Sequence, residues 1–342
     1  MEWVSPQFSR SAVDKAGTIL VTDVPDPADL EQAYSVINNW RSSHSRPLYT
    51  FRYGLRLRAE KIDVNALVAQ RIKRLSSIRL KLKLLPQMKL SQMQDIGGCR
   101  AVVTSVGDVY KIVKSYKTSD LKHKLLSEDD YVKNPKTSGY RSYHLIYSYY
   151  SDKKTTHNKL RIEVQIRSQL QHAWATAVET VGTFIRQALK SSLGEEEWLR
   201  FFALMGSAIA IREKTALVPN TPTNNSQLKE EIQKQVSNLD VIARLHTYGN
   251  ALNAIEQPEV AGANYYLLEL DPSLMRVQVS TYGQRDLERA ASDYLAVEKQ
   301  IAGSNSDAVL VSVDSISSLR RAYPNYFLDT QRFLEAVNET IS

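Results

Sequence analysis

The chain has 342 residues and a mass of 38.7 kDa, which predicts two domains because one hydrophobic core seldom organises more than about 250 residues. With 43% apolar and 24% charged residues, the composition excludes a disordered chain. The single cysteine, Cys99, excludes an internal disulfide scaffold and a cysteine-rich zinc site, and favours a reducing, cytoplasmic setting. The first residues lack a basic run before an apolar stretch, so neither a secretion signal nor a membrane span is expected.

Charge is unevenly divided along the chain. The formal net charge is +7, but residues 220–342 carry 10 basic against 16 acidic side chains, whereas residues 1–219 carry 34 against 21. A segment that basic indicates a polyanionic ligand such as a nucleotide or a nucleic acid, and an acidic segment could dock against it. Two solvated surfaces of opposite sign would give the same counts.

Apolar periodicity predicts the elements of the basic segment. In chain order, helices are expected over residues 9–22, 27–61, 106–117, 169–189 and 195–214, and strands over residues 96–104, 143–150 and 160–167. Residues 64–83 form a basic amphipathic element between the second helix and the first strand. In the last strand, even-numbered apolar residues alternate with Arg161, Glu163, Gln165 and Arg167, which predicts one buried and one polar face.

Residues 216–227 contain Pro219 and Pro222 among several Asn and Thr, and they predict the domain boundary. The predicted domains are residues 1–219 and residues 220–342. In the second, helices are expected over residues 226–257, 286–301 and 327–337, and strands over residues 265–270, 275–280 and 308–313. This pattern predicts a smaller α+β domain at the C-terminal end.

Two carboxylates stand on or just before these predicted strands, among basic residues. Asp95 precedes one strand and Glu163 lies on the polar face of another, so the two could share Mg²⁺, which binds one or two carboxylates together with phosphate oxygens. The basic residues around them, and a tyrosine expected to be exposed, Tyr140, make phosphoryl or pyrophosphoryl transfer plausible. No glycine-rich phosphate loop of the common kinds is present. The alternative is that Asp95 only caps the start of a strand and that Glu163 pairs with Arg161 or Arg167 across the sheet.

A series of motifs follows this constellation in chain order. They are residues 71–78 (RIKRLSSI) with Lys81, residues 95–100 (DIGGCR), residues 130–144 (DYVKNPKTSGYRSYH) and residues 163–167 (EVQIR). Together they closely resemble the synthetase domain of the RelA/SpoT family over about residues 40–200. The resemblance implies an α+β fold with a nucleotidyltransferase-like mixed sheet flanked by helices. It also implies transfer of the β,γ-pyrophosphoryl group of ATP to a ribose 3′-hydroxyl.

The resemblance assigns the ATP side of the site. Arg71 would stack on the adenine, a role that suits its planar cation. Asp95 and Glu163 would be the catalytic carboxylates and the Mg²⁺ ligands, with Glu163 sharing the metal or accepting the proton of the 3′-hydroxyl. The rest of the implied ATP-binding set is Lys73, Lys81 and Arg100.

The resemblance also assigns an acceptor side. Tyr140 would stack on the acceptor base, which by itself does not choose the base. The implied acceptor-binding set also contains Lys136, Ser138, Gly139, His144, Gln165 and Arg167. Ser138 and Arg141 stand where the family usually has Asn and Gln, and residues 127–129 resemble the acidic variant of monofunctional synthetases. No His-Asp pair of a hydrolase half occurs, so the chain is expected to make a product that it cannot remove.

Tyr323 and Tyr326 form a Tyr-x-x-Tyr pattern near the end of the acidic segment. The pattern resembles the neutralising motif of fused toxin–antitoxin members of the family, the CapRel type, in which it blocks the ATP pocket in cis. That resemblance implies a phage-defence role with a phage capsid protein as the trigger. The alternative is a pair of aromatic side chains that pack into a small core.

Two acceptor classes follow from the resemblance. One is GDP or GTP, which gives (p)ppGpp, and the other is the 3′-terminal adenosine of the tRNA CCA end, whose modification stops translation. Lysines at positions 111, 114, 117, 122 and 124 would suit a nucleic-acid backbone or form a solvated face. We favour a tRNA-modifying toxin restrained by its C-terminal domain, with alarmone synthesis as a close alternative. In a third interpretation the domain only binds a nucleotide or RNA.

Overall fold

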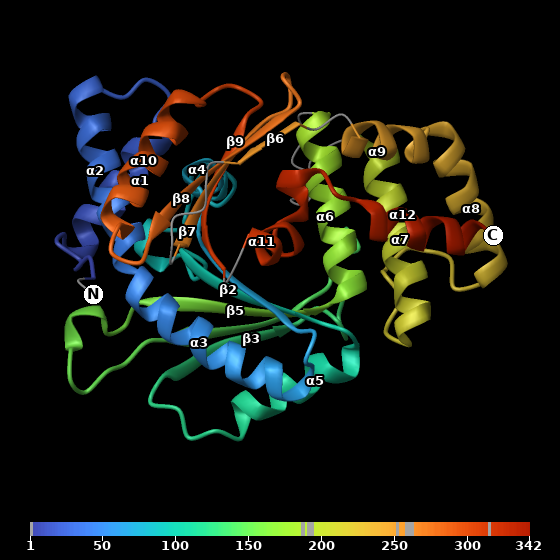
Figure 1. Ribbon diagram of the computed structural model, residues 1–342, viewed down its shortest axis with the longest axis horizontal. Helices are drawn as coiled ribbons and strands as arrows, with labels where there is room; N and C mark the ends of the chain where they lie inside the picture. Colours follow the sequence, from blue (N-terminus) through green and yellow to red (C-terminus); the bar gives the residue numbers. More distant parts are fainter. Residues whose placement is uncertain (1–2, 186–188, 190–194, 251–252, 257–262, 314–315) are drawn as a thin grey trace.

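The computed structural model describes residues 3–185, 189, 195–250, 253–256, 263–313 and 316–342 (Figure 1). The strands in these residues are β1 (Leu67–Ile72), β2 (Gly97–Val103), β3 (Lys124–Asp130), β4 (Tyr143–Ser148), β5 (Arg161–Ser168), β6 (Asn253–Glu256), β7 (Ala263–Asp271), β8 (Arg276–Gly283) and β9 (Asp307–Ser312). They form one mixed sheet of nine strands in the order β3-β4-β5-β2-β1-β9-β7-β8-β6. Among the strands in the described residues, only the β2–β5 and β6–β8 pairs are parallel.

Helices flank this sheet, so the expected α+β fold with a mixed sheet is confirmed (Figure 1). Those before the boundary are α1 (Arg10–Val21), α2 (Pro27–Ser43), α3 (Ser45–Ile62), α4 (Leu75–Leu84), α5 (Val106–Lys117), α6 (Gln169–Phe184) and α7 (Glu196–Glu213). Those after it are α8 (Asn225–Asn238), α9 (Val241–Asn250), α10 (Leu287–Gln300), α11 (Ile316–Ala322), the 3-10 turn η4 (Pro324–Phe327) and α12 (Gln331–Ile341). Among the helices described, none has the length and apolar character needed to cross a membrane.

The C-terminal strands extend the sheet of the basic segment. β9 pairs antiparallel with β1, with Arg71 opposite Val311, and β7 and β8 continue outward from β9. This pairing satisfies the backbone groups of β1 that would otherwise be left open at a sheet edge. Residues 1–219 and 220–342, predicted as separate domains, therefore share one sheet.

The two faces of the sheet around β1, β2 and β5 are covered by different elements. Helices α3 and α5 pack on one face, where Phe51 and Ile112 meet the even-numbered apolar residues of β5. The opposite face lies under α6 and under residues 316–327, as Figure 1 shows. Since side chains alternate between the faces of a strand, the polar residues of β5 point toward this second face.

A helical bundle joins the two segments a second time. Helices α7, α8, α9 and α12 gather beside α6 (Figure 1). Their shared core contains Trp198, Phe201 and Phe202 of α7, together with Ile232 of α8 and Phe333 of α12. The C-terminal helices are therefore packed against the basic segment through a large aromatic core.

Several elements differ from their predicted form. The basic element over residues 64–83 is a strand followed by a helix, because β1 pairs with β2 and the helical turn starts only at Leu75. The helix expected over residues 226–257 breaks at Asp240, whose φ of 48° ends α8; residues 251–252 and 257 of that prediction lie outside the described residues. The helix expected from residue 327 begins at Gln331, because Leu328 has a φ of 53°. The edge strand β3 was not predicted.

Candidate active site

The strand register aligns the sequence motifs on one face of the sheet. Glu163 of β5 lies opposite Gly98 of β2, which lies opposite Arg71 of β1. The next row toward α6 contains Gln165 and Arg100, also opposite each other. Because Gly98 has no side chain, the row has an open floor between the carboxylate of Glu163 and the guanidinium of Arg71. A ligand placed there would touch both.

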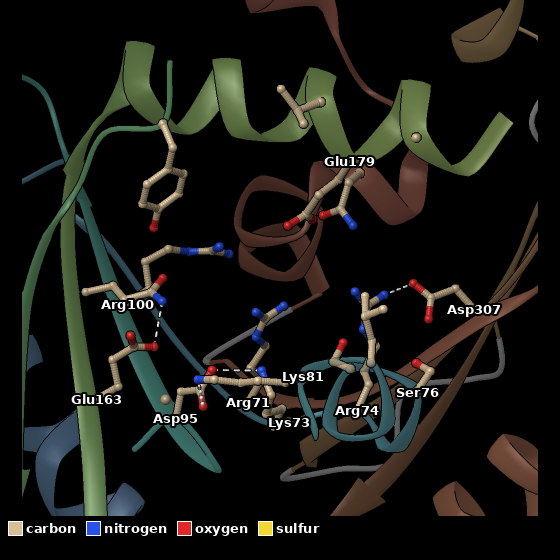
Figure 2. Close-up of a pocket in the computed structure, with 18 of the residues that line it drawn as sticks. Arg71, Lys73, Arg74, Ser76, Lys81, Asp95, Arg100, Glu163, Glu179 and Asp307 are labelled. Atoms are coloured by element: carbon tan, nitrogen blue, oxygen red, sulfur yellow. Dashed lines mark hydrogen bonds and ion pairs between the residues drawn. The ribbon is translucent and has the colours of Figure 1, made fainter. Parts of the chain in front are cut away.

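A cavity of about 1110 Å³ opens over these rows (Figure 2). The sequence-predicted residues that line it are Arg71, Lys73, Lys81, Asp95, Arg100, Lys136, Tyr140, His144, Glu163, Gln165 and Tyr323. Within the described part of the chain, Ser138, Gly139, Arg167 and Tyr326 are not among its lining residues. The structure thus brings most of the predicted ATP and acceptor residues to a single cavity, and four of the predicted residues do not line it.

Asp95 is held between two lysines at one end of the cavity. Its Oδ2 lies 2.7 Å from Lys73 Nζ and its Oδ1 lies 3.0 Å from Lys81 Nζ (Figure 2). The backbone N–H of Lys73 donates a hydrogen bond to the Ile96 carbonyl oxygen at 2.9 Å. This hydrogen bond continues the β1–β2 pairing and keeps Lys73 beside Asp95. Burial acts to raise the pKa of Asp95, but the two ammonium groups outweigh burial and hold that pKa well below its usual range. Asp95 is therefore a carboxylate at any physiological pH.

Glu163 is fixed by partners on its own strand and on β4. Its Oε1 lies 3.0 Å from His144 Nδ1, and its Oε2 accepts a hydrogen bond from Gln165 Nε2 at 2.7 Å. His144 Nε2 lies 2.9 Å from the Tyr140 hydroxyl, which also accepts from Arg167 at 3.2 Å. Burial acts to raise the pKa of Glu163, but His144 outweighs burial and lowers it. Glu163 is thus ionised and oriented toward the cavity.

The protonation of His144 gives a testable pH dependence. Burial alone would lower the pKa of His144, but the Tyr140 hydroxyl and the Glu163 carboxylate outweigh burial and raise it from 6.5 to about 9. A raised folded-state pKa adds stability that is complete below pH 6.5 and is lost as the pH rises through about 9. The difference in unfolding free energy between the wild type and His144→Gln should therefore shrink between about pH 6.5 and pH 9. Urea denaturation of both proteins across that range measures the difference, and a pH-independent difference would contradict the charged imidazole.

Glu179 of α6 is a cavity residue that the sequence motifs did not identify. Its side chain projects from α6 toward the cavity that Arg71 also lines (Figure 2). Burial acts to lower the pKa of Arg71, but Glu179 opposes burial most strongly, and the pKa is raised. Glu179 is the only acidic residue, and the only strongly charged one, in the sequence of α6. A single carboxylate on an otherwise apolar and neutral helix is the feature of the sequence that could have indicated a functional role for Glu179.

The loop before β4 supports the cavity from behind. Gly139 has a φ of 94°, and a Cβ there would lie 2.8 Å from the Phe202 carbonyl oxygen of α7, so only glycine fits this approach. Arg141 is buried and donates to the carbonyl oxygens of Val132 at 3.3 Å and of Ala216 at 2.6 Å. Arg141 therefore anchors the loop to the segment after α7 and does not face the acceptor.

Tyr140 differs from its predicted exposure. Its side chain is only 6% exposed, not exposed as expected from its glycine-bounded loop. The ring packs edge-on against Tyr131, His144 and Trp174. Arg167, predicted to contact the acceptor, instead lies behind the ring with its Cζ 5.6 Å from the ring centroid. Tertiary packing from α6 covers what the local sequence leaves open.

The C-terminal segment contacts the arginines at the other end of the cavity. Arg100 donates to the Ala322 carbonyl oxygen, and its Cζ lies 5.2 Å from the centroid of the Tyr323 ring. The Tyr323 hydroxyl donates to the Gln70 carbonyl oxygen at 3.0 Å. Tyr323 is 3% exposed. It packs in the core below α11 and also lines the cavity, so packing and contact with the predicted ATP-binding residues occur together.

Tyr326 reaches a different arginine, Arg74, through an acidic partner. Arg74 forms an ion pair with Asp307 at the start of β9 (Figure 2). The Tyr326 hydroxyl donates to Asp307 Oδ2 at 3.0 Å and accepts from Arg74 at 3.2 Å. Asp307 also lines the cavity, although it lies in none of the sequence motifs. Tyr326 thus acts at the turn between β1 and α4.

Comparisons with known proteins agree with this site. Residues 70–182 match the family described as the region found in RelA / SpoT proteins. GTP pyrophosphokinase YjbM of Bacillus subtilis is 33% identical over 111 residues, which are 32% of this chain and 52% of that protein. GTP pyrophosphokinase YwaC of the same organism is 32% identical over 85 residues, 25% of this chain and 40% of that protein. The chain therefore spans about half the length of these relatives or less.

Solved structures are similar at lower levels. Small alarmone synthetase 1 from Bacillus subtilis bound to its product pppGpp is 26% identical, with a TM-score of 0.36, over 43% of this chain and 73% of that chain. A GTP pyrophosphokinase family protein from Streptococcus pneumoniae is 22% identical, with a TM-score of 0.41, over 49% of this chain and 85% of that chain. The family match contains the cavity residues Arg71, Asp95, Glu163 and Glu179. Residues 70–182 of this chain are therefore similar to the region found in RelA / SpoT proteins.

Proposed function

We propose that the chain is a pyrophosphokinase that transfers the β,γ-pyrophosphoryl group of ATP to the ribose 3′-hydroxyl of GDP or GTP. The observation that carries the proposal is the row of Arg71, Gly98 and Glu163 across one cavity. It separates a cationic end, suited to ATP, from a polar end around Glu163 and His144, suited to an acceptor hydroxyl. The sequence-matched relatives, which are named GTP pyrophosphokinases, support the guanosine acceptor.

The ATP end supplies charge and a stacking surface. Lys73 and Lys81 stand where a triphosphate would need its charge offset. Arg71, a planar cation whose charge is sustained by Glu179, is suited to stack on the adenine. Arg100 is within reach of the same phosphates once Ala322 and Tyr323 withdraw.

Asp95 and Glu163 are suited to hold Mg²⁺. Each of their oxygens has a single hydrogen-bond or ion-pair contact, and a carboxylate oxygen has a second lone pair to offer. Mg²⁺ commonly takes one or two carboxylates and completes its shell with phosphate oxygens and water. Bound Mg²⁺ would offset the charge that develops on the transferred phosphates.

Glu163 is the group suited to accept the proton of the attacking hydroxyl. It stays ionised because His144 compensates its burial, and the contacts to His144 and Gln165 fix its two oxygens. A fixed carboxylate within hydrogen-bond reach can orient the hydroxyl and take its proton as the hydroxyl oxygen bonds to the β-phosphorus of ATP. The bond from that phosphorus to the oxygen bridging to the α-phosphate breaks in the same step, and AMP leaves with that oxygen. Lys136 lies over the Tyr131 ring at 4.6 Å, at the edge of the same polar end, where it can meet acceptor phosphates.

A tRNA 3′ end is the second candidate acceptor, favoured by the excess of basic over acidic residues in residues 1–219. The lysines that suggested a nucleic-acid backbone are partly neutralised. Lys111 pairs with Asp108, Lys117 with Glu128, and Lys122 with Asp152. The guanosine acceptor is preferred for this reason. The CapRel-type toxin role and the phage-defence role stay predictions.

The contacts of Tyr323, Tyr326 and Asp307 support restraint of this activity by the C-terminal segment. They engage Arg100 and Arg74 on the ATP side of the cavity. Because the segment belongs to the same chain, its effective concentration at the cavity is high, on the order of millimolar. ATP would have to displace these contacts before Arg100 can bind phosphate.

A single labelling assay tests the proposal. The full chain, and the same chain with Asp307→Asn and Tyr326→Phe to weaken the restraint, is incubated with Mg²⁺ and γ-labelled ATP, and GDP, GTP and deacylated tRNA are offered separately. We expect label in a guanosine polyphosphate. Label on tRNA that is lost when the terminal adenosine is removed would replace the guanosine acceptor by tRNA. Label in no product would favour a module that only binds nucleotide or RNA.

A further inference from the structure

Helix α4 begins without a capping side chain of its own. Its N-cap residue is Arg74, which makes no side-chain cap bond, so the first backbone N–H groups of α4 need other partners. Glu298 Oε1 of α10 accepts a hydrogen bond from Leu75 N at 2.6 Å. A carboxylate at this position also interacts favourably with the N-terminal end of the helix dipole. The cap of α4 thus comes from the C-terminal segment.

Glu298 is held rigidly in this role. Its Oε2 pairs with Arg41 of α2 at 2.6 Å, while Oε1 serves α4. Arg41 is 1% exposed and Glu298 is 8% exposed, so the pair is enclosed by protein. The Arg41 guanidinium also lies 4.6 Å from the centroid of the Tyr294 ring, one turn earlier on α10. The carboxylate therefore has a fixed position between two helices and the start of α4.

The capped turn leads directly to the lysines of the cavity. Lys73 precedes α4 and Lys81 lies within it, and both pair with Asp95 (Figure 2). A shift of the first turn of α4 would move the ammonium groups of Lys73 and Lys81 away from Asp95. Precise placement of such groups contributes strongly to binding and catalysis.

We propose that Glu298 is a positioning residue for the ATP-binding lysines and that residues 220–342 contain two functionally distinct parts. One part, α10 with β9, completes the synthetase site by capping α4 and pairing with β1. The other part, residues 316–329 together with Asp307 at the start of β9, covers the arginines of that site. The role in ATP binding rests on the proposed function. Removing the whole C-terminal segment would then release the restraint and damage the ATP site at the same time.

A matched pair of full-length variants tests the cap. Arg41→Met with Glu298→Met removes the ion pair and the capping oxygen, and Arg41→Met with Glu298→Gln removes the ion pair but keeps an amide oxygen for Leu75 N. Both should fold, because apolar replacement of a buried ion pair is often neutral or stabilising. The exposed Glu288 on the same helix provides the control Glu288→Gln. All variants keep the contacts of Tyr323, Tyr326 and Asp307. Differences in ATP affinity between the variants therefore report on α4.

Two measurements follow for each variant. Hydrogen exchange should show the amide of Leu75 deprotected at least about tenfold in the methionine variant and protected in the glutamine variant and the control, with β2 and β5 unchanged. The Kd for Mg²⁺-ATP should rise about tenfold in the methionine variant, as for loss of one cap, and stay within about twofold in the others. This graded rescue by glutamine is not expected from a packing defect.

Other outcomes separate the two hypotheses. Equal protection of Leu75 and equal ATP affinity in the matched pair would overturn the positioning role and leave the proposed function intact. Deprotection of Leu75 in the methionine variant without a change in ATP affinity would overturn the link from the cap to the lysines. Absence of ATP binding by the wild type and by the restraint-weakened chain would overturn the proposed function together with this role.

Discussion

Replacing Glu163 with glutamine is expected to lower pyrophosphoryl transfer by about 100- to 10,000-fold, the range typical of general acid–base catalysis. Glutamine preserves the size of the side chain but cannot accept the hydroxyl proton or carry the charge that faces His144. The loss should fall on kcat more than on the KM for ATP, because Lys73, Lys81 and Asp95 are untouched. Initial rates measured at varied ATP and acceptor concentrations check this expectation.

The control for this substitution is Glu128→Gln on the edge strand β3. Glu128 is a half-exposed carboxylate that pairs with Lys117 and is not among the cavity-lining residues described. It should change the rate by less than about twofold, since an exposed pair contributes little. If Glu163→Gln kept a rate within tenfold of the wild type while folding normally, Glu163 would be only an ion-pair partner on the sheet, which is the alternative that its sequence pattern left open.

Apolar periodicity was sufficient to predict those helices and strands whose own residues alternate between a buried and an exposed face. The strict alternation of β5 predicted that Glu163, Gln165 and Arg167 share a face, because the period of two is a property of the strand alone. Helix α5 has the predicted bounds of residues 106–117, since Ser105 caps it and its apolar residues recur at helical spacing. The site residues on these elements were predictable for the same reason.

Long-range pairing was not predictable in this way. β3 is a polar edge strand, so neither of its faces imposes an apolar alternation. The pairing of Arg71 with Val311 joins β1 to β9 across most of the chain, and no local pattern names the partner of a strand. The division into two domains followed from composition, whereas the shared sheet follows from this pairing.

The cavity residues likewise divide into those that local motifs identify and those whose role depends on contacts between distant segments. Asp95 and Glu163 lie in motifs and could be found from sequence. Asp307 has no motif around it, and its importance arises only because β9 places it beside Arg74. The burial of Tyr140 arises similarly from its packing against Trp174 of α6. Roles that depend on a contact between distant segments required the fold.

Weakening the contact at Arg74 is expected to raise ATP affinity by about 10- to 100-fold. Asp307→Asn with Tyr326→Phe removes the charge that pairs with Arg74 and the hydroxyl that bridges the two. A hydrogen bond to a charged group contributes about 1.5–3 kcal/mol, and each 1.4 kcal/mol is about tenfold in affinity. Phenylalanine keeps the buried ring in its core, whereas alanine would open a cavity costing about 3–5 kcal/mol. Calorimetric titration of Mg²⁺-ATP onto the full chain measures the change.

The direction of that change decides what the C-terminal contacts do. Asp329→Asn, which alters an exposed aspartate near η4, should leave ATP affinity unchanged and so controls for charge alone. Asp307 and Tyr326 contact Arg74, which lies between Lys73 and α4. They therefore either compete with ATP or help to hold its site. An affinity that rises, with transfer rising in parallel, supports restraint in cis. An unchanged affinity in a folded variant would mean that Asp307 and Tyr326 serve packing and that the cavity accepts ATP with their contacts in place. A lower affinity would mean that the two residues help to hold the ATP site.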